Sequence, residues 1–254
     1  MSTLLEIQGL TKRFVKDETG IVALRDFDLE VEKGSFVTIL GRSGCGKSTA
    51  LNLLSGLLAP TSGTVSYRGT KVTGPRTEIS YLTQSDTLMP WRDVRRNIEM
   101  PMEISGVSKR ERRERAEELI GRVGLTGFER HYPRELSGGM RRRASLARML
   151  AGDPETLLMD EPFGALDAQL RTDLQVELLN LWQGSGKTVV FVTHDIEEAL
   201  LLGDRVVVLG LLGRRVLDKQ IDLSRPRDAD ELRVDPTFVA LHREMTEALR
   251  EGAR

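Results

Sequence analysis

Short apolar runs and alternating apolar positions dominate the first third of the chain. They predict five strands, at residues 4–10, 21–31, 36–40, 64–69 and 78–84. One helix is expected at 46–58, directly after the third strand. This part of the sequence therefore predicts a β-rich region in which one strand leads into a helix.

From about Asp86 the pattern changes to helical spacing. The clearest case is the segment 108–124, in which apolar residues recur on one face, at Ala116, Leu119, Ile120 and Val123. Ser108 and Glu111 form a candidate capping box at its start. The charged residues of this segment are interpreted as the solvated face of the helix.

Strands return in the last hundred residues. Short apolar runs at 156–159, 188–194 and 205–210 are typical of parallel strands that are buried on both faces. Two further helices are expected at 167–183 and 235–252. Their apolar positions are Leu170, Leu174, Leu178 and Leu181 in the first, and Phe238, Leu241, Met245 and Leu249 in the second.

This order of elements predicts an α/β fold with a mostly helical block inserted between strands. We expect a single domain, with a core at 1–85 and 156–220, an inserted helical subdomain at about 86–155, and a helical tail at about 221–254. The tail is shorter than a separate folded domain usually is.

Composition narrows the class of protein. The chain has 254 residues, with 37 Lys and Arg against 38 Asp and Glu, so its charge gives no reason to expect nucleic acid as a partner. The single cysteine, Cys45, excludes an intrachain disulfide and suits a reducing cytoplasm. We see neither a signal peptide nor an apolar run near the roughly 18 residues of a spanning helix. We therefore expect a soluble chain, or one held at a membrane by another molecule.

The segment "GRSGCGKST" matches the phosphate-loop pattern G-x-x-x-x-G-K-[ST] from Gly41 to Ser48. Glycines let the backbone N–H groups point at a phosphate, and the following helix adds its positive end. Lys47 is expected to reach the β- and γ-phosphates, Ser48 to bind Mg²⁺, and Cys45 to be a small filler. The alternative is a glycine-rich turn that matches by chance, which the flanking strand and helix disfavour. The expected loop comprises Gly41, Arg42, Ser43, Gly44, Cys45, Gly46, Lys47, Ser48 and Thr49.

Acidic residues follow a buried strand in "TLLMDEP". In open α/β sheets, ligands bind at the carboxyl ends of strands. Asp160 is expected to hold Mg²⁺ through water, and Glu161 to orient or deprotonate the attacking water. The alternative for Asp160 is a cap on the following turn.

His194 and Gln84 also stand at the ends of expected strands. A lone histidine is often only a satisfied core residue, but the position of His194 favours a role in the reaction. Gln84 by itself is a weak signal, since a glutamine at a strand end is usually a turn residue.

Taken together, the motifs resemble those of a known family. Their order is "GRSGCGKST", Gln84, "LSGGM", "LLMDEP", "GALD" and "FVTHD". Over almost the whole chain this is similar to the nucleotide-binding subunit of ATP-binding-cassette (ABC) transporters. Two residues depart from the family pattern, since Met140 and Arg142 stand where glutamine is typical. The resemblance implies a P-loop NTPase core with a mostly parallel sheet, an N-terminal antiparallel β part and an inserted helical subdomain.

The resemblance also implies how the site is assembled. Two chains pair head to tail, and each ATP lies between the phosphate loop of one chain and the signature of the other. The implied roles are a contact to the partner's γ-phosphate for Ser137, Gly138 and Gly139, adenine stacking for Phe14, and communication between sites for Asp167. Gln84 resembles the lid glutamine that senses Mg²⁺. For Phe14, a strand-packing role is the alternative.

The segment 85–102 bears on which transporter this is. Together with "HYPRELSGGM" and "DEPFGALDAQLR" it looks most like importers of nitrate, sulfonate, taurine and related small anions. Leu88, Met89 and Trp91 are expected either to contact membrane subunits or to form the apolar base of the helical subdomain.

The sequence therefore predicts an ATPase, with ATP and Mg²⁺, that energises a bacterial-type importer. The expected partners are a second copy of the chain, two transmembrane permease subunits and, indirectly, an extracytoplasmic solute-binding protein, with no nucleic acid. The chain would lie at the cytoplasmic face of the membrane. Alternatives are an exporter ATPase, a non-transport ABC ATPase, and a P-loop kinase, which would leave "LSGGM" without a role.

Overall fold

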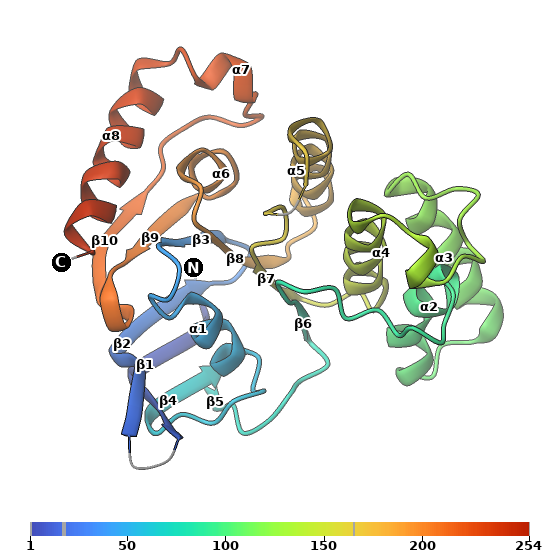
Figure 1. Ribbon diagram of the computed structural model, residues 1–254, viewed down its shortest axis with the longest axis horizontal. Coiled ribbons are helices and arrows are strands. Elements are labelled where there is room, and N and C mark those ends of the chain that lie inside the picture. The colour runs from blue at the N-terminus through green and yellow to red at the C-terminus, as the bar shows by residue number, and fades with distance from the viewer. Residues whose placement is uncertain (1, 17–18, 165, 254) are drawn as a thin grey trace. The chain divides into compact units, whose positions relative to one another are not determined.

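Two long strands pair antiparallel at the start of the chain in the computed structural model (Figure 1). They are β1 (Thr3–Lys16) and β2 (Thr19–Glu32), and with β4 (Ser62–Tyr67) and β5 (Thr70–Lys71) they form a sheet of order β2-β1-β4-β5. This is the predicted antiparallel part. β1 extends beyond the expected end at residue 10, because its backbone keeps pairing with β2 after the apolar pattern stops.

The structure describes residues 2–16, 19–164 and 166–253, so Ala165 of the "GALD" motif lies outside them. Contacts divide the chain into two compact units. The first unit holds residues 1–76 and 187–254, and the second holds residues 77–186. This division differs from the expected core, insert and tail, whose boundaries stay a prediction.

A parallel sheet lies at the centre of the first unit. β3 (Phe36–Gly41) pairs in parallel with β8 (Thr188–Thr193) on one side and β9 (Arg205–Leu209) on the other. Every residue of β3 and β8 is buried, which explains their continuous apolar runs. β10 (Arg215–Gln220) adds an antiparallel strand at the edge of β9. The sequence did not predict β10, because its residues are mostly polar and only partly buried.

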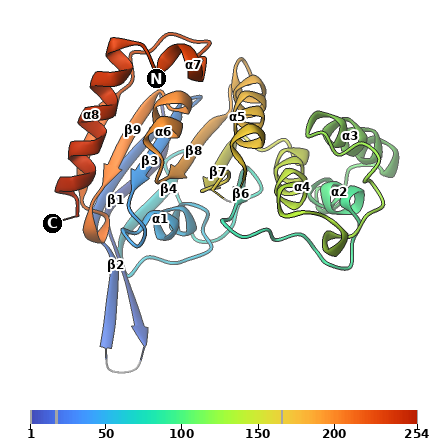
Figure 2. The ribbon, with the colours of Figure 1, turned by 45° about the horizontal axis from the view of Figure 1, so that its top comes forward.

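The α-helices that the structure describes in the first unit are α1 (Lys47–Leu54), α6 (Ile196–Leu202), α7 (Ala229–Leu232) and α8 (Pro236–Glu251). Helix α8 runs beside β9 and β10 (Figure 2), and its apolar face packs on Leu40, Val206 and Val208. The expected helix at 235–252 is confirmed. The expectation that α1 reaches residue 58 is wrong. The chain turns at Gly56, whose φ is +77°, and only glycine fits there because a Cβ would lie 2.2 Å from the carbonyl oxygen of Gly74.

The second unit contains a parallel pair of strands and a group of helices. The strands are β6 (Ile79–Leu82) and β7 (Thr156–Asp160), and β7 is buried throughout. The helices are α2 (Val94–Ile104), α3 (Lys109–Arg122), η1 (Pro133–Glu135), α4 (Gly138–Ala151) and α5 (Ala168–Trp182). The predicted start of α3 is confirmed, since Ser108 Oγ accepts a hydrogen bond from the Glu111 backbone N–H at 3.3 Å.

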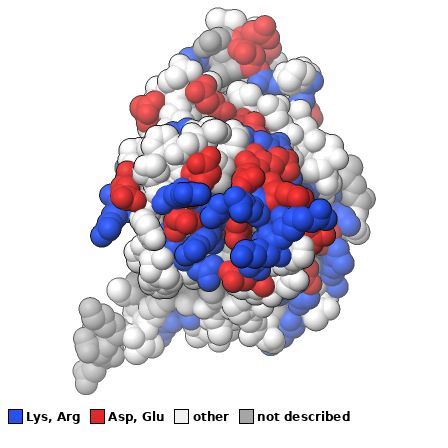
Figure 3. Space-filling model, turned by 90° about the vertical axis from the view of Figure 1, so that its right-hand side faces the viewer, with Lys and Arg blue, Asp and Glu red and all other residues white. Residues whose placement is uncertain are grey.

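The charged run of α3 is its exposed face, as expected. Arg113 pairs with Glu117 at 3.0 Å, and Arg115 pairs with Glu118 at 2.7 Å. Figure 3 shows positive and negative side chains interleaved over this side of the protein. Exposed pairs of this kind add little stability, about 0–1 kcal/mol each. Among the described residues, we find no helix with both the length and the apolar character needed to cross a bilayer.

Candidate nucleotide-binding and catalytic site

The phosphate loop joins β3 to α1 in the first unit, and its three glycines are needed for different reasons. Gly44 and Gly46 have φ values of +82° and +109°, which other residues rarely adopt. A Cβ at Gly41 would lie 2.6 Å from Sγ of Cys45, and one at Gly46 would lie 2.6 Å from Cδ2 of Leu24. Tight packing therefore holds both ends of the loop. Beside Gly44 the space is open, with no described atom within 4 Å of a Cβ placed there.

Lys47 is the first residue of α1 and turns its side chain into the loop. Its Nζ donates to the carbonyl oxygens of Gly41 at 2.8 Å and Arg42 at 3.1 Å, and the residue is only 5% exposed. Within this described stretch, no side chain caps the start of α1 at Gly46. Uncapped N–H groups at a helix start attract anions. The open cradle, the free helix start and the lysine therefore fit a phosphate group.

The other expected loop residues surround this cradle. Cys45 is buried, as its expected role as a filler requires, whereas Arg42 and Ser43 are exposed. Ser48 lies in the first turn of α1 and is exposed, so its hydroxyl oxygen is accessible to a cation. Thr49, which follows it, is half-buried.

Phe14 lies near the end of β1, opposite Ile21 of β2. The residue is 40% exposed, and Nζ of Lys12 is 5.2 Å from the centre of its ring. A ring with this exposure has free area for stacking on a base and is not a core-packing residue.

Asp160 ends β7 in the second unit and is 3% exposed. Tyr81 of the neighbouring strand β6 donates its hydroxyl to Oδ2 of Asp160 at 3.4 Å. Burial raises the pKa of Tyr81, and the negative charge of Asp160 raises it further. The phenol therefore stays protonated near neutral pH and remains a hydrogen-bond donor to the carboxylate.

Glu161 follows β7 with a φ of +44°, which is rare for a residue with a side chain. Such a conformation costs about 1–3 kcal/mol and persists only where the surroundings hold it. The amide Nε2 of Gln84 lies 3.5 Å from Oε2 of Glu161, at the outer limit of a hydrogen bond. Gln84 is exposed just beyond the end of β6, so the predicted strand is two residues too long.

Arg142 of helix α4 contacts the backbone of both chain segments that carry Gln84 and Glu161. It donates hydrogen bonds to carbonyl oxygens of Thr83 and Gln84, and to those of Asp160, Glu161 and Pro162. The sequence showed Arg142 only as a departure from a family pattern and did not point to Tyr81 at all. Both residues belong to this part of the site.

His194 directly follows β8 in the first unit, and its side chain is exposed. The backbone around it is held by its neighbours. Thr193 Oγ1 donates to Oε2 of Glu198 at 2.6 Å and accepts from the Asp195 N–H at 3.0 Å. Asp195 in turn caps α6. The imidazole is therefore presented to solvent from a fixed turn.

The signature starts helix α4 in the second unit. Oγ of Ser137 caps the helix by accepting from the Met140 N–H at 3.2 Å. A Cβ at Gly139 would lie 2.8 Å from Cδ2 of Leu170, so glycine allows α5 to pack closely. Gly138 is exposed at the first position of the helix.

Asp167 caps α5, because its Oδ1 accepts from the Leu170 N–H at 3.0 Å. The predicted site residues are thus divided between the units. Phe14, the phosphate loop and His194 belong to the first unit, and Gln84, the signature, Asp160, Glu161 and Asp167 belong to the second. Within the second unit, the structure brings Gln84 beside Glu161, whereas the signature and Asp167 begin separate helices.

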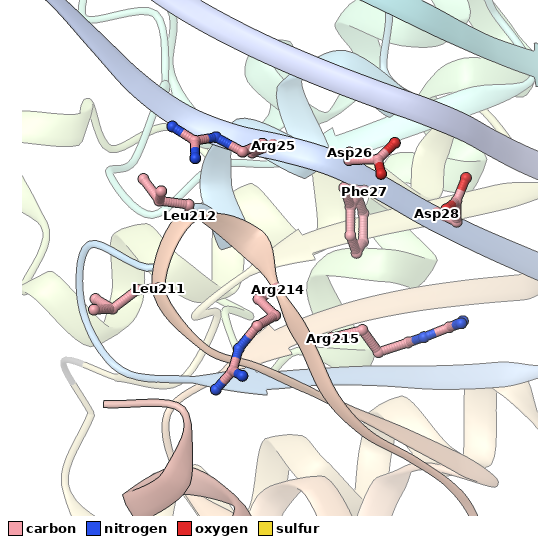
Figure 4. Close-up of a pocket in the computed structure, with 8 residues that line it drawn as sticks. All are labelled: Arg25, Asp26, Phe27, Asp28, Leu211, Leu212, Arg214 and Arg215. Atoms are coloured by element: carbon pink, nitrogen blue, oxygen red, sulfur yellow. The ribbon is translucent and has the colours of Figure 1, made fainter. Parts of the chain in front are cut away.

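A separate cavity of about 480 Å³ lies in the first unit (Figure 4). Its lining comes from β2 and from η2 (Leu211–Gly213) with the residues that follow, and comprises Arg25, Asp26, Phe27, Asp28, Leu211, Leu212, Arg214 and Arg215. Two of its charged groups already have partners, since Asp28 accepts from the Gly9 N–H and Arg215 pairs with Asp218. None of the predicted site residues lines this cavity.

Comparison with known proteins identifies the family. A family model described as ABC transporter matches residues 24–164, which is more than half of the chain. The chain belongs to the ABC transporter family. The predicted ABC ATP-binding subunit is therefore confirmed, as is the prediction of a nucleotide-binding ATPase coupled to transport.

Curated relatives refine this similarity. The chain is 40% identical over 242 residues to the taurine import ATP-binding protein TauB of Yersinia pestis, covering 93% of each chain. It is 39% identical over 253 residues to the nitrate import ATP-binding protein NrtD of Synechocystis sp., covering 97% of this chain and 95% of the relative.

A solved structure shares the fold. It is a dimeric, post-hydrolysis state of the ATP-binding cassette MJ0796 bound to ADP and Pi, with a TM-score of 0.80 and 33% identity. The match covers 87% of this chain and all of the other. The predicted fold class is therefore confirmed, with a P-loop NTPase core that contains parallel and antiparallel strands together with helices.

Proposed function

We propose that this ABC ATPase energises the import of a small anion of the nitrate, sulfonate or taurine class. The observation that carries the proposal is its similarity, over nearly its full length, to ATP-binding proteins named for taurine and nitrate import. The solute itself is expected to contact the permease and not this chain. The choice among these anions therefore rests on the relatives.

The first unit supplies the nucleotide contacts. The N–H groups of the phosphate loop and the start of α1 bind the phosphates, and Lys47 exchanges its bonds to Gly41 and Arg42 for phosphate oxygens. The exposed ring of Phe14 stacks on the adenine. These residues hold ATP in place, which is the main requirement for phosphoryl transfer.

Mg²⁺, when bound, neutralises negative charge on the phosphates. The residues of this chain that would hold it are Ser48, Gln84 and Asp160, the last through water. Their hydroxyl, amide and carboxylate oxygens are the hard ligands that Mg²⁺ prefers. Asp160 is buried with a hydrogen bond from Tyr81, so its carboxylate is already oriented without the metal.

Glu161 is the proposed base that polarises the attacking water. Its carboxylate lies within reach of the Gln84 amide, and its backbone keeps a strained conformation that persists only where the surroundings hold it. His194, on its fixed turn after β8, is proposed to donate an imidazole N–H to the γ-phosphate.

The signature is proposed to act on the ATP of a second copy. Gly138 and Gly139 begin a helix of 14 residues, so their N–H groups carry the positive end of a long helix dipole. ATP binding would close a head-to-tail homodimer, and hydrolysis would reopen it, with Asp167 linking the two sites. The dimeric state of the MJ0796 structure supports this arrangement.

Coupling to the membrane is proposed to use the segment around Trp91. Leu88 is 7% exposed, which supports a place in the apolar base of the helical subdomain, whereas Trp91 is 71% exposed. We therefore assign the apolar base to Leu88 and the contact to membrane subunits to Trp91. Trp91 is therefore accessible to one of two permease subunits. These subunits would hold the chain at the cytoplasmic face of the membrane, and they would receive solute from a binding protein.

The proposal is tested by co-purifying the chain with permease subunits from its own cells, reconstituting them in vesicles, and adding the solute-binding protein on the side opposite this chain. Uptake of labelled taurine, nitrate and an alkanesulfonate is measured with ATP on the side of this chain, and the Glu161→Gln variant serves as control. We expect ATP-dependent uptake of at least one of these anions. Transport in the opposite direction, or of none of them, would contradict the import assignment.

A further inference from the structure

Arg142 contacts five backbone carbonyl groups that lie far from it in the sequence. Nε donates to Pro162 O at 2.6 Å, and Nη1 donates to Thr83 O at 2.6 Å and Gln84 O at 3.3 Å. Nη2 donates to Asp160 O at 3.2 Å and Glu161 O at 3.3 Å. All of these residues belong to the second unit.

The number and direction of these bonds suit a guanidinium group. Arginine carries five N–H donors in a rigid, planar fork, and here five carbonyl oxygens accept from them. Glutamine, which is typical at this place in the family, offers two donors from a single amide nitrogen. It therefore cannot reproduce contacts to both backbone segments at once.

Arg142 is buried, with 8% of its surface exposed. The guanidinium group of arginine stays protonated at neutral pH. A buried charge is stable only when it is fully hydrogen-bonded, so the carbonyl contacts are needed to keep Arg142 in place.

The two segments that Arg142 joins carry the proposed catalytic groups. One contains Gln84, and the other contains Asp160 and Glu161. Glu161 has a φ of +44°, a conformation that persists only where neighbouring contacts hold it. The bond from Arg142 to the Glu161 carbonyl is a contact of this kind.

We propose that Arg142 is a positioning residue. It joins helix α4 to the backbone of Gln84 and Glu161 and so keeps these two side chains in the relative positions that hydrolysis requires. The inference rests on the proposed roles of Gln84 and Glu161. Because α4 also begins with the signature, Arg142 connects the signature helix to both proposed catalytic segments.

The experiment compares Arg142→Lys, Arg142→Gln and Arg142→Met with Arg143→Gln. Arg143 is the matched control, since this neighbouring arginine donates to the carbonyl groups of Val123 and Gly124, away from the proposed catalytic residues. Lysine keeps the charge and carries three N–H donors on one nitrogen atom, glutamine carries two N–H donors on one planar amide nitrogen, and methionine carries none. ATPase kinetics are measured for each variant that folds, as judged by its melting temperature.

We expect Arg142→Lys to lower kcat by roughly 10- to 100-fold, as small misplacements of reacting groups do. KM for ATP should change by less than about twofold, because ground-state binding by the phosphate loop is unaffected. Arg142→Gln should lower kcat less than Arg142→Lys does, and Arg143→Gln should keep the kcat of the unaltered chain. A folded Lys or Met variant with unchanged kcat, or with only KM changed, would overturn the inference.

Hydrogen exchange separates this inference from the proposed function. Without nucleotide, the amides of residues 83–85, 161, 163 and 164 should exchange faster in Arg142→Lys and Arg142→Gln than in the unaltered chain and in Arg143→Gln. Unchanged exchange in both Arg142 variants would overturn the positioning role. The unaltered chain could hydrolyse no ATP while these amides still exchanged faster in the Arg142 variants. That result would contradict the proposed function but support the contact of Arg142 with the backbone.

Discussion

The side-chain amide of Gln84 lies next to the carboxylate of Glu161, with Nε2 3.5 Å from Oε2, although 77 residues separate them in the chain. Both residues follow parallel strands, because Gln84 stands beyond the end of β6 and Glu161 directly after β7. The structure thus places a polar amide beside the carboxylate proposed to polarise water.

Glu161→Gln should retain ATP binding and lose most hydrolysis. The amide keeps the size of the carboxylate but cannot accept a proton, and a general base contributes about 100- to 10,000-fold to a rate. We expect ATP to trap a stable dimer, detected by size exclusion, while phosphate release falls by about 100-fold or more. Near-normal turnover in the variant would contradict the role of Glu161.

Lys47→Ala should weaken nucleotide binding itself. It removes the charge proposed to face the phosphates, and hydrogen bonds to charged groups contribute about 1.5–3 kcal/mol. The dissociation constant for ATP should therefore rise by roughly 10- to 100-fold. Titration with a fluorescent ATP analogue measures this change, and the exposed Lys71→Ala is the control. Equal affinity in both variants would exclude a phosphate contact by Lys47.

Phe14→Ala should raise the ATP concentration that gives half-maximal rate and leave the maximal rate nearly unchanged. Stacking on a base contributes about 1–3 kcal/mol, so a shift of about 5- to 100-fold is expected. Phe14→Tyr keeps a ring and should behave like the unaltered chain. Because the ring is 40% exposed, neither change should lower the melting temperature much. An unchanged KM for Phe14→Ala would remove this residue from the nucleotide site.

Trp91→Ala should leave the isolated ATPase working and abolish ATP-driven uptake in the reconstituted system. Trp91 is 71% exposed, so its loss should change stability by at most about 0.5 kcal/mol. Leu88→Ala is the contrasting variant. Leu88 is buried, and its truncation should cost about 2–5 kcal/mol. Thermal unfolding and uptake are measured for both, and full uptake by Trp91→Ala would place the permease contact elsewhere.

Mixed dimers test whether the signature acts across the interface. In one dimer, a chain with Lys47→Ala is paired with a chain carrying Ser137→Arg. In the other, one chain carries both changes and its partner is unaltered. If the signature serves the partner's ATP, the first dimer keeps one intact site and traps nucleotide, whereas the second dimer has none. Trapping only in the second dimer would show that each signature serves its own chain.

Consecutive residues were enough to predict several local structures of this protein. The phosphate loop, the Ser108 cap of α3 and the acidic end of β7 each depend on residues that are neighbours in the sequence. Glycine spacing, a capping hydroxyl and an apolar strand act over a few residues, so their structures follow from local sterics and hydrogen bonding. The family and the fold class followed from the order of these motifs.

Tertiary structure decided what depends on distant partners. β10 becomes a strand by pairing with β9, and its mostly polar sequence does not predict a strand. Tyr81 meets Asp160 across 79 residues, and Arg142 meets the Thr83 carbonyl across 59. The role proposed for Arg142 depends on the carbonyl groups that packing brings next to its side chain. No periodicity or motif in the sequence predicts these contacts, because they form only when the chain has folded.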